Sequence, residues 1–124
     1  MAEIISLSLA VQAANGPSCA VSKTWNDLAA YDKADITVPK AGTYAITMTP
    51  SVGAVHLLLI TAGAYSADLK YSVTNGAQNV PLDGPHLFAG AGAVGLLQEQ
   101  ETFTFANGGS EDVEVSILVG RKAV

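Results

Sequence analysis

The sequence predicts an all-β fold, an antiparallel β-sandwich or jelly roll of about eight short strands. Apolar and small polar residues alternate along most of the chain, which is the period of two expected of a strand with one buried face. Turn signals rich in Gly, Asn and Pro separate these runs at intervals of about 8 to 12 residues. Helical periodicity is confined to two short stretches. Residues 1–124 are therefore predicted to form one β-sandwich domain.

The first half of the chain supplies three of these strands. Residues 3–11 (EIISLSLAV) alternate strictly and predict a half-buried strand, which ends at a turn over residues 15–17. Residues 34–50 (ADITVPKAGTYAITMTP) predict a hairpin that turns at Pro39–Gly42. Between these segments, residues 24–34 (TWNDLAAYDKA) contain helix-capping residues and predict a short helical turn.

The second half continues the pattern. Residues 54–61 (AVHLLLIT) form a continuous apolar run of strand length, typical of a strand at the centre of a sandwich. Residues 68–82 predict a hairpin that turns at Asn75-Gly76. Residues 102–120 predict two further strands joined through Asn-Gly-Gly-Ser. A second short helical turn is expected within residues 91–101.

Composition excludes several classes of partner. Charged residues make up 14% of the chain and the net charge is -5, with no basic cluster larger than Arg121-Lys122, so a nucleic-acid partner is not expected. The longest apolar runs fall short of the about 20 residues of a membrane-spanning helix, so no membrane contact is expected either. The first residues lack the basic start of a secretory signal, and Cys19 is the only cysteine. We therefore expect synthesis in a host cytoplasm and a fold without disulfides.

Three glycines have the spacing of a dinucleotide-binding loop. Gly90, Gly92 and Gly95 follow the order G-x-G-x-x-G. Such a loop needs a parallel strand before it and a long helix after it, so that the pyrophosphate lies at the helix N-terminus. Prolines interrupt the preceding segment and only one strand pair follows. We therefore predict no cofactor, and interpret the stretch as an apolar loop that packs closely against another backbone.

Other catalytic and metal-binding patterns are weak. His56 lies within the apolar run 54–61 and is interpreted as a core or interface histidine, while His86 has no second histidine nearby to complete a zinc site. Asp27, Asp32 and Asp35 match no EF-hand spacing and are interpreted as solvated loop carboxylates. We predict that the chain is not an enzyme and holds no metal.

Aromatic residues leave one alternative open. A β-sandwich can bind sugar by stacking it on exposed rings, which would make the chain a carbohydrate-binding module. Trp25 lies in the segment predicted to be irregular and is the candidate platform.

The order of the β-runs resembles a family. The stretches SLSLAVQAANGPS, ITVPKAGTYAITMTP, LKYSVTNGAQNVPLDGPHLFAGAG and TFTFANGGSEDVEVSILVGR cover nearly the whole chain. In this order they resemble the small all-β structural proteins of tailed-bacteriophage virions, particularly head decoration or cement proteins. The resemblance implies a homo-oligomer such as a trimer that binds the major capsid protein and reinforces the phage head. A tail or baseplate component has a similar pattern, and the resemblance transfers no functional residue.

One stretch is predicted to form a subunit interface. No charged residue occurs between Asp83 and Glu99, a span too apolar for an ordinary solvent loop. The large apolar side chains proposed for this contact are Leu87, Phe88, Val94, Leu96 and Leu97.

Overall fold

The computed structural model describes residues 3–47, 55–74, 76–97 and 102–122. The elements in these ranges, in chain order, are β1 (Glu3–Gln12), β2 (Ser18–Val38), β3 (Gly42–Thr47), β4 (Val55–Ala62), β5 (Leu69–Val73), β6 (Val80–Pro81), β7 (His86–Ala89), α1 (Ala91–Val94), the 3-10 turn η1 (Gly95–Leu97), β8 (Thr102–Asn107) and β9 (Val113–Lys122). The all-β prediction is confirmed, and the two helical pieces together span only residues 91–97.

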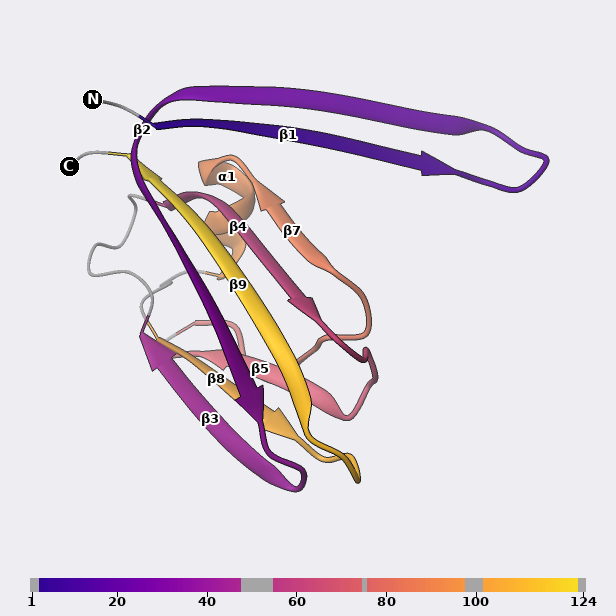
Figure 1. Cartoon of the computed structure of the whole chain (residues 1–124), viewed down its shortest axis with the longest axis vertical. Helices are drawn as coiled ribbons and strands as arrows, with labels where there is room; N and C mark the ends of the chain where they lie inside the picture. The colour runs from indigo at the N-terminus through magenta and orange to yellow at the C-terminus, as the bar shows by residue number, and fades with distance from the viewer. Residues whose placement is uncertain (1–2, 48–54, 75, 98–101, 123–124) are drawn as a thin grey trace.

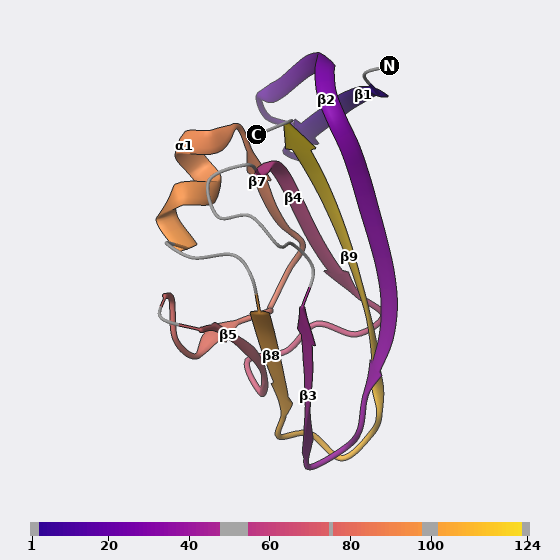
Figure 2. The ribbon, with the colours of Figure 1, turned by 90° about the vertical axis from the view of Figure 1, so that its left-hand side faces the viewer.

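The strands form two antiparallel sheets that pack against each other. One sheet has the order β1-β2-β9-β4-β7, and the other has the order β3-β8-β5-β6. Figure 2 shows the two layers, with β3, β8 and β5 facing β9 and β4. The predicted sandwich is therefore confirmed, although β2, with 21 residues, is far from short.

Large apolar side chains fill the space between the sheets. Alternate residues of β8 point inward, where Phe103 and Phe105 lie against Tyr71 of β5. Leu58 and Ile60 of β4 supply the facing layer and are fully buried. Each such side chain contributes about 1.5–3 kcal/mol through removal from water. The alternation read in the sequence is thus explained by a shared core.

Two turns that were expected to close hairpins instead carry the chain between the sheets. β2 pairs with β9 while β3 pairs with β8, so the hairpin predicted for residues 34–50 is wrong. The turn itself exists, because the Gly42 N–H donates to the Pro39 carbonyl oxygen at 3.0 Å. The chain likewise passes from β8 to β9 in the other sheet. A tight turn reverses the chain in either case, and burial against the facing layer decides which strands pair.

Residues 24–34 are strand rather than helix. They belong to β2, whose first half pairs with β1, from Ser18 to Leu28, and whose second half pairs with β9, from Leu28 to Val38. Backbone pairing along the whole strand outweighs the weak capping signals that predicted a helical turn.

The β1–β2 hairpin extends away from the two packed sheets (Figure 1). We call residues 5–25 the arm. In the described structure β1 pairs with β2 alone, and the turn at the tip has Asn15 in the left-handed region, with a φ of 58°. The Ala13 N–H donates to the Pro17 carbonyl oxygen at 3.1 Å, so the turn predicted at residues 15–17 is confirmed.

Candidate functional surface

The arm has one apolar face and one polar face. Residues that lie directly opposite each other in an antiparallel pair share a face. The apolar face consists of the pairs Ile5 with Trp25, Leu7 with Lys23, Leu9 with Val21, and Val11 with Cys19. The polar face consists of Ser6 with Thr24, Ser8 with Ser22, Ala10 with Ala20, and Gln12 with Ser18.

The base of the arm packs on the body of the protein. Trp25 and Leu57 are buried together, with Ile5, Leu7 and Leu87 packed around them. The Lys23 ammonium lies 5.3 Å from the centre of the Trp25 ring, which adds a cation–π contact. Trp25 is therefore a buried anchor in a strand, and this burial does not fit the alternative in which its ring is an exposed sugar platform. Its ring is held among apolar neighbours because Trp25, paired with Ile5, lies on the face of the arm that meets Leu57.

The outer half of the arm is exposed. Leu9 is 41% exposed, Val21 51% and Val11 61%, so the half-buried strand predicted for residues 3–11 is half-buried only at its base. A two-stranded ribbon is marginally stable in water when nothing covers its apolar face. The outer half of the arm is therefore a candidate interaction surface.

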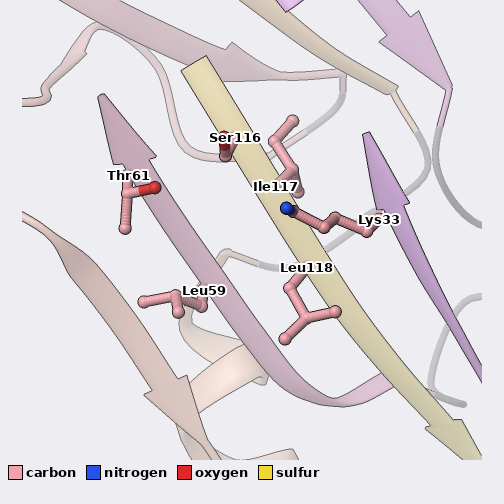
Figure 3. Close-up of a pocket in the computed structure, with 6 residues that line it drawn as sticks. All are labelled: Lys33, Leu59, Thr61, Ser116, Ile117 and Leu118. Atoms are coloured by element: carbon pink, nitrogen blue, oxygen red, sulfur yellow. The ribbon is translucent and has the colours of Figure 1, made fainter. Parts of the chain in front are cut away.

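A second apolar surface lies on the outer face of the five-stranded sheet. Leu87, Leu59, Leu118 and Lys33 form one row across β7, β4, β9 and β2, because each is the register partner of the next. We call these four residues the outer row. Leu59 and Leu118 line a shallow hollow of about 190 Å³ together with Lys33, Thr61, Ser116 and Ile117 (Figure 3).

The hollow is bordered by polar groups on β2 and β9. Ser116 donates its hydroxyl to an Asp35 carboxylate oxygen at 2.5 Å, and the Lys33 ammonium lies 3.8 Å from the other oxygen. Figure 3 shows the Lys33 side chain extending from β2 across β9. Tyr31, one row further along β2, is more than half exposed. The surface thus combines an apolar centre with one satisfied, solvent-exposed charge pair, and such an exposed pair adds little stability.

The five residues of the predicted interface separate into two groups. Val94 and Leu97 are buried in the main core, and Phe88 packs against the same core from β7. These three therefore serve the fold of the single chain, because α1 and η1 turn their apolar side inward. Leu87 lies in the outer row, and Leu96 is exposed. Of the five, Leu96 is exposed, Leu87 and Phe88 are partly buried, and Val94 and Leu97 are buried.

The two histidines lie in different surroundings. His86 begins β7 and points into the protein, where its Nδ1 is 2.8 Å from the Tyr71 hydroxyl and its ring meets the Tyr71 ring edge to face. Burial raises the pKa of Tyr71 to about 12, so this hydroxyl stays neutral and available for hydrogen bonding. His56 is partly buried, and its carbonyl oxygen accepts from the Gly90 N–H at 2.8 Å. Among the residues that the structure describes, neither histidine is hydrogen-bonded to a serine, threonine or cysteine side chain, as a general base beside such a nucleophile would be.

The glycine stretch follows an antiparallel edge strand. β7 pairs antiparallel with β4, Gly90 has a φ of +97°, and α1 extends for four residues. A dinucleotide loop requires a parallel strand before the glycines and a long helix after them. Here an antiparallel strand precedes the glycines and a four-residue helix contains the second of them. Of the three aspartates considered for calcium, the side chains of Asp27 and Asp32 lie outside the described part of the structure. Within the residues that are described, no three acidic, histidine or cysteine side chains gather as a metal site would need.

No family model, curated protein or solved structure matches this chain. Among the described residues, no helix has the length and apolar character needed to cross a membrane. The arm is the feature that residue-by-residue interpretation missed. A signal for it was present, since the sequence holds no charged residue between Glu3 and Lys23.

Proposed function

We propose that the chain is a non-enzymatic structural protein of a tailed-bacteriophage virion, a decoration or cement protein of the head. The observation that carries this proposal is the arm, which holds an apolar face away from the body of the protein. A projecting ribbon of this kind suits a protein that acts by contacting neighbours in a lattice.

The proposed mechanism is burial of surface. A subunit that binds only the assembled shell stabilises that shell by mass action, by an amount set by the quality of the interface. In this proposal the chain binds the major capsid protein and its own copies, as a trimer or another closed oligomer. The low charge content of the chain favours such contacts, because few charged groups must lose water when two surfaces meet.

Cosedimentation with phage particles tests the proposal. The purified chain is mixed with separated phage heads and separated tails, and each mixture is sedimented through sucrose. We expect the chain to move with heads and to reach a saturating ratio to the major capsid protein. Exclusive movement with tails would replace the head role with a tail or baseplate role, and movement with neither would overturn the virion proposal.

A further inference from the structure

The chain already makes one contact between the apolar face of its arm and the outer face of its five-stranded sheet. Ile5, Leu7 and Trp25 at the base of the arm lie on Leu57 and Leu87 of that sheet. The contact is small, and both surfaces continue beyond it. The arm continues to Leu9, Val11 and Val21, and the sheet continues along the outer row.

We propose that the outer half of the arm binds, apolar face down, to the outer row of a second copy of this chain. The two surfaces have matching chemistry, since Leu9 and Val21 would meet Leu59 and Leu118. Within one copy, Leu7 and Leu87 already pack on the same buried cluster of Trp25 and Leu57. The contact between copies would thus continue the packing of arm on sheet that each copy already makes within itself. The polar face of the arm, with its serines, threonine and alanines, would remain toward solvent.

The distribution of charged residues favours a second copy of this chain as the binding partner of the arm. All 11 acidic and all 6 basic residues lie outside residues 4–22, so the arm can approach a second negatively charged copy without repulsion. A partner recognised by its charge would find no complementary group on the outer half of the arm. The outer row supplies an apolar surface that can cover the exposed Leu9, Val11 and Val21 of this half.

The contact is compatible with two kinds of closed assembly. Two copies that exchange arms form a two-fold dimer, and copies that each pass an arm to the next form a ring. This inference deepens the proposed function, because it names the contact between copies. It stands or falls separately from binding to a phage head, since the experiments below use the purified chain alone.

Two substitutions on adjacent residues of β1 test the arm. Leu9→Lys places a charge on the apolar face, whereas Ser8→Lys places the same charge on the polar face one residue away. Both positions lie on the outer half of the arm, away from the core between the sheets, and circular dichroism checks that each variant folds. We expect light scattering to show oligomers for the wild type and for Ser8→Lys. For Leu9→Lys we expect the dissociation constant of the oligomer to rise at least about tenfold, because an unpaired charge must lose water in the contact. A monomeric wild type, or equal behaviour of the two variants, would overturn the proposal.

Cross-linking tests the other half of the contact. Cys19 is the only cysteine and lies on the apolar face opposite Val11, near the tip of the arm. Under oxidising conditions we expect Leu118→Cys to give a covalent dimer between Cys19 of one copy and the introduced thiol of the next. Thr43→Cys, an exposed position on the other sheet, is the matched control and should cross-link far less. Equal cross-linking of the two variants would refute the arm-on-sheet contact. Efficient Cys19–Cys19 dimers in the wild type would refute it too, in favour of arm-to-arm packing.

Discussion

Replacing Leu97 with Ala tests whether η1 belongs to the core or to a subunit contact. Leu97 is 4% exposed and packs with Val94 in the main core, whereas its neighbour Leu96 is 75% exposed. Leu→Ala removes about three methylene equivalents, worth roughly 2.4 kcal/mol when fully buried at about 0.8 kcal/mol each. The cavity that remains adds to this loss, so we expect Leu97→Ala to lower the free energy of unfolding by about 2.5–4 kcal/mol. The same change at Leu96 should cost only about 0.6 kcal/mol, a quarter of the transfer value.

Urea unfolding, followed by far-ultraviolet circular dichroism, measures both variants. Trp25 is the single tryptophan and is buried at the base of the arm, so its fluorescence gives a second, local signal. Protein concentration is varied as a control, because the unfolding midpoint of an oligomer depends on concentration and a loss of oligomerisation would remove that dependence. If the two alanine variants differ by less than about 0.5 kcal/mol, the reasoning that places Leu97 in the core fails.

Three further predictions concern the interior and the backbone. Asn107→Ala should lower the free energy of unfolding by about 2–3 kcal/mol, because the buried side-chain amide donates to the carbonyl oxygens of Val38 and Glu111 and accepts from the Gly109 N–H. Denaturant titration measures this loss, and an unchanged midpoint would contradict the prediction. Tyr71 has a folded pKa raised to about 12 from 10.0, so its contribution to stability is present below pH 10 and is lost as the pH rises from 10 towards 12. The free energy of unfolding, measured at each pH, should therefore fall more steeply over this window for the wild type than for Tyr71→Phe. Parallel curves for the two proteins would argue against the buried hydroxyl. Gly90→Ala should destabilise by about 1 kcal/mol or more because its φ is +97°, whereas Gly92→Ala, inside α1 with open space around it, should be neutral or slightly stabilising; equal thermal shifts would refute the strain at Gly90.

Period-two alternation was enough to predict the fold class, but not which strands pair. The alternating runs on either side of Pro39–Gly42 predict two strands and a turn, and all three are present. Whether the second strand joins the first sheet or the facing sheet depends on which strands from other parts of the chain lie beside it. β2 is paired by β9, which lies more than 70 residues further along the chain. Local spacing contains no information on such a distant partner.

The candidate surface was only partly accessible from the sequence. The chargeless stretch before Glu99 correctly indicated apolar packing, but composition does not distinguish packing within a chain from packing between chains. Val94 and Leu97 proved to be core, whereas Leu87 lies in the outer row. The direction of each side chain decides this, and in α1 and η1 that direction changes with every residue.

The arm shows that alternation predicts a buried face without saying what buries it. β8 and β1 have the same pattern, but β8 is covered by its own chain and β1 is covered only at its base. Leu9, Val11 and Val21 each retain about half of their surface in water, which leaves roughly 1 kcal/mol per residue, or about 3 kcal/mol per arm, for a partner. Loss of translational and rotational freedom on association costs at least about 4 kcal/mol, so one arm alone gives only weak binding. A stable assembly therefore requires two or more arms to be engaged at once, which is the condition that a closed dimer or ring satisfies.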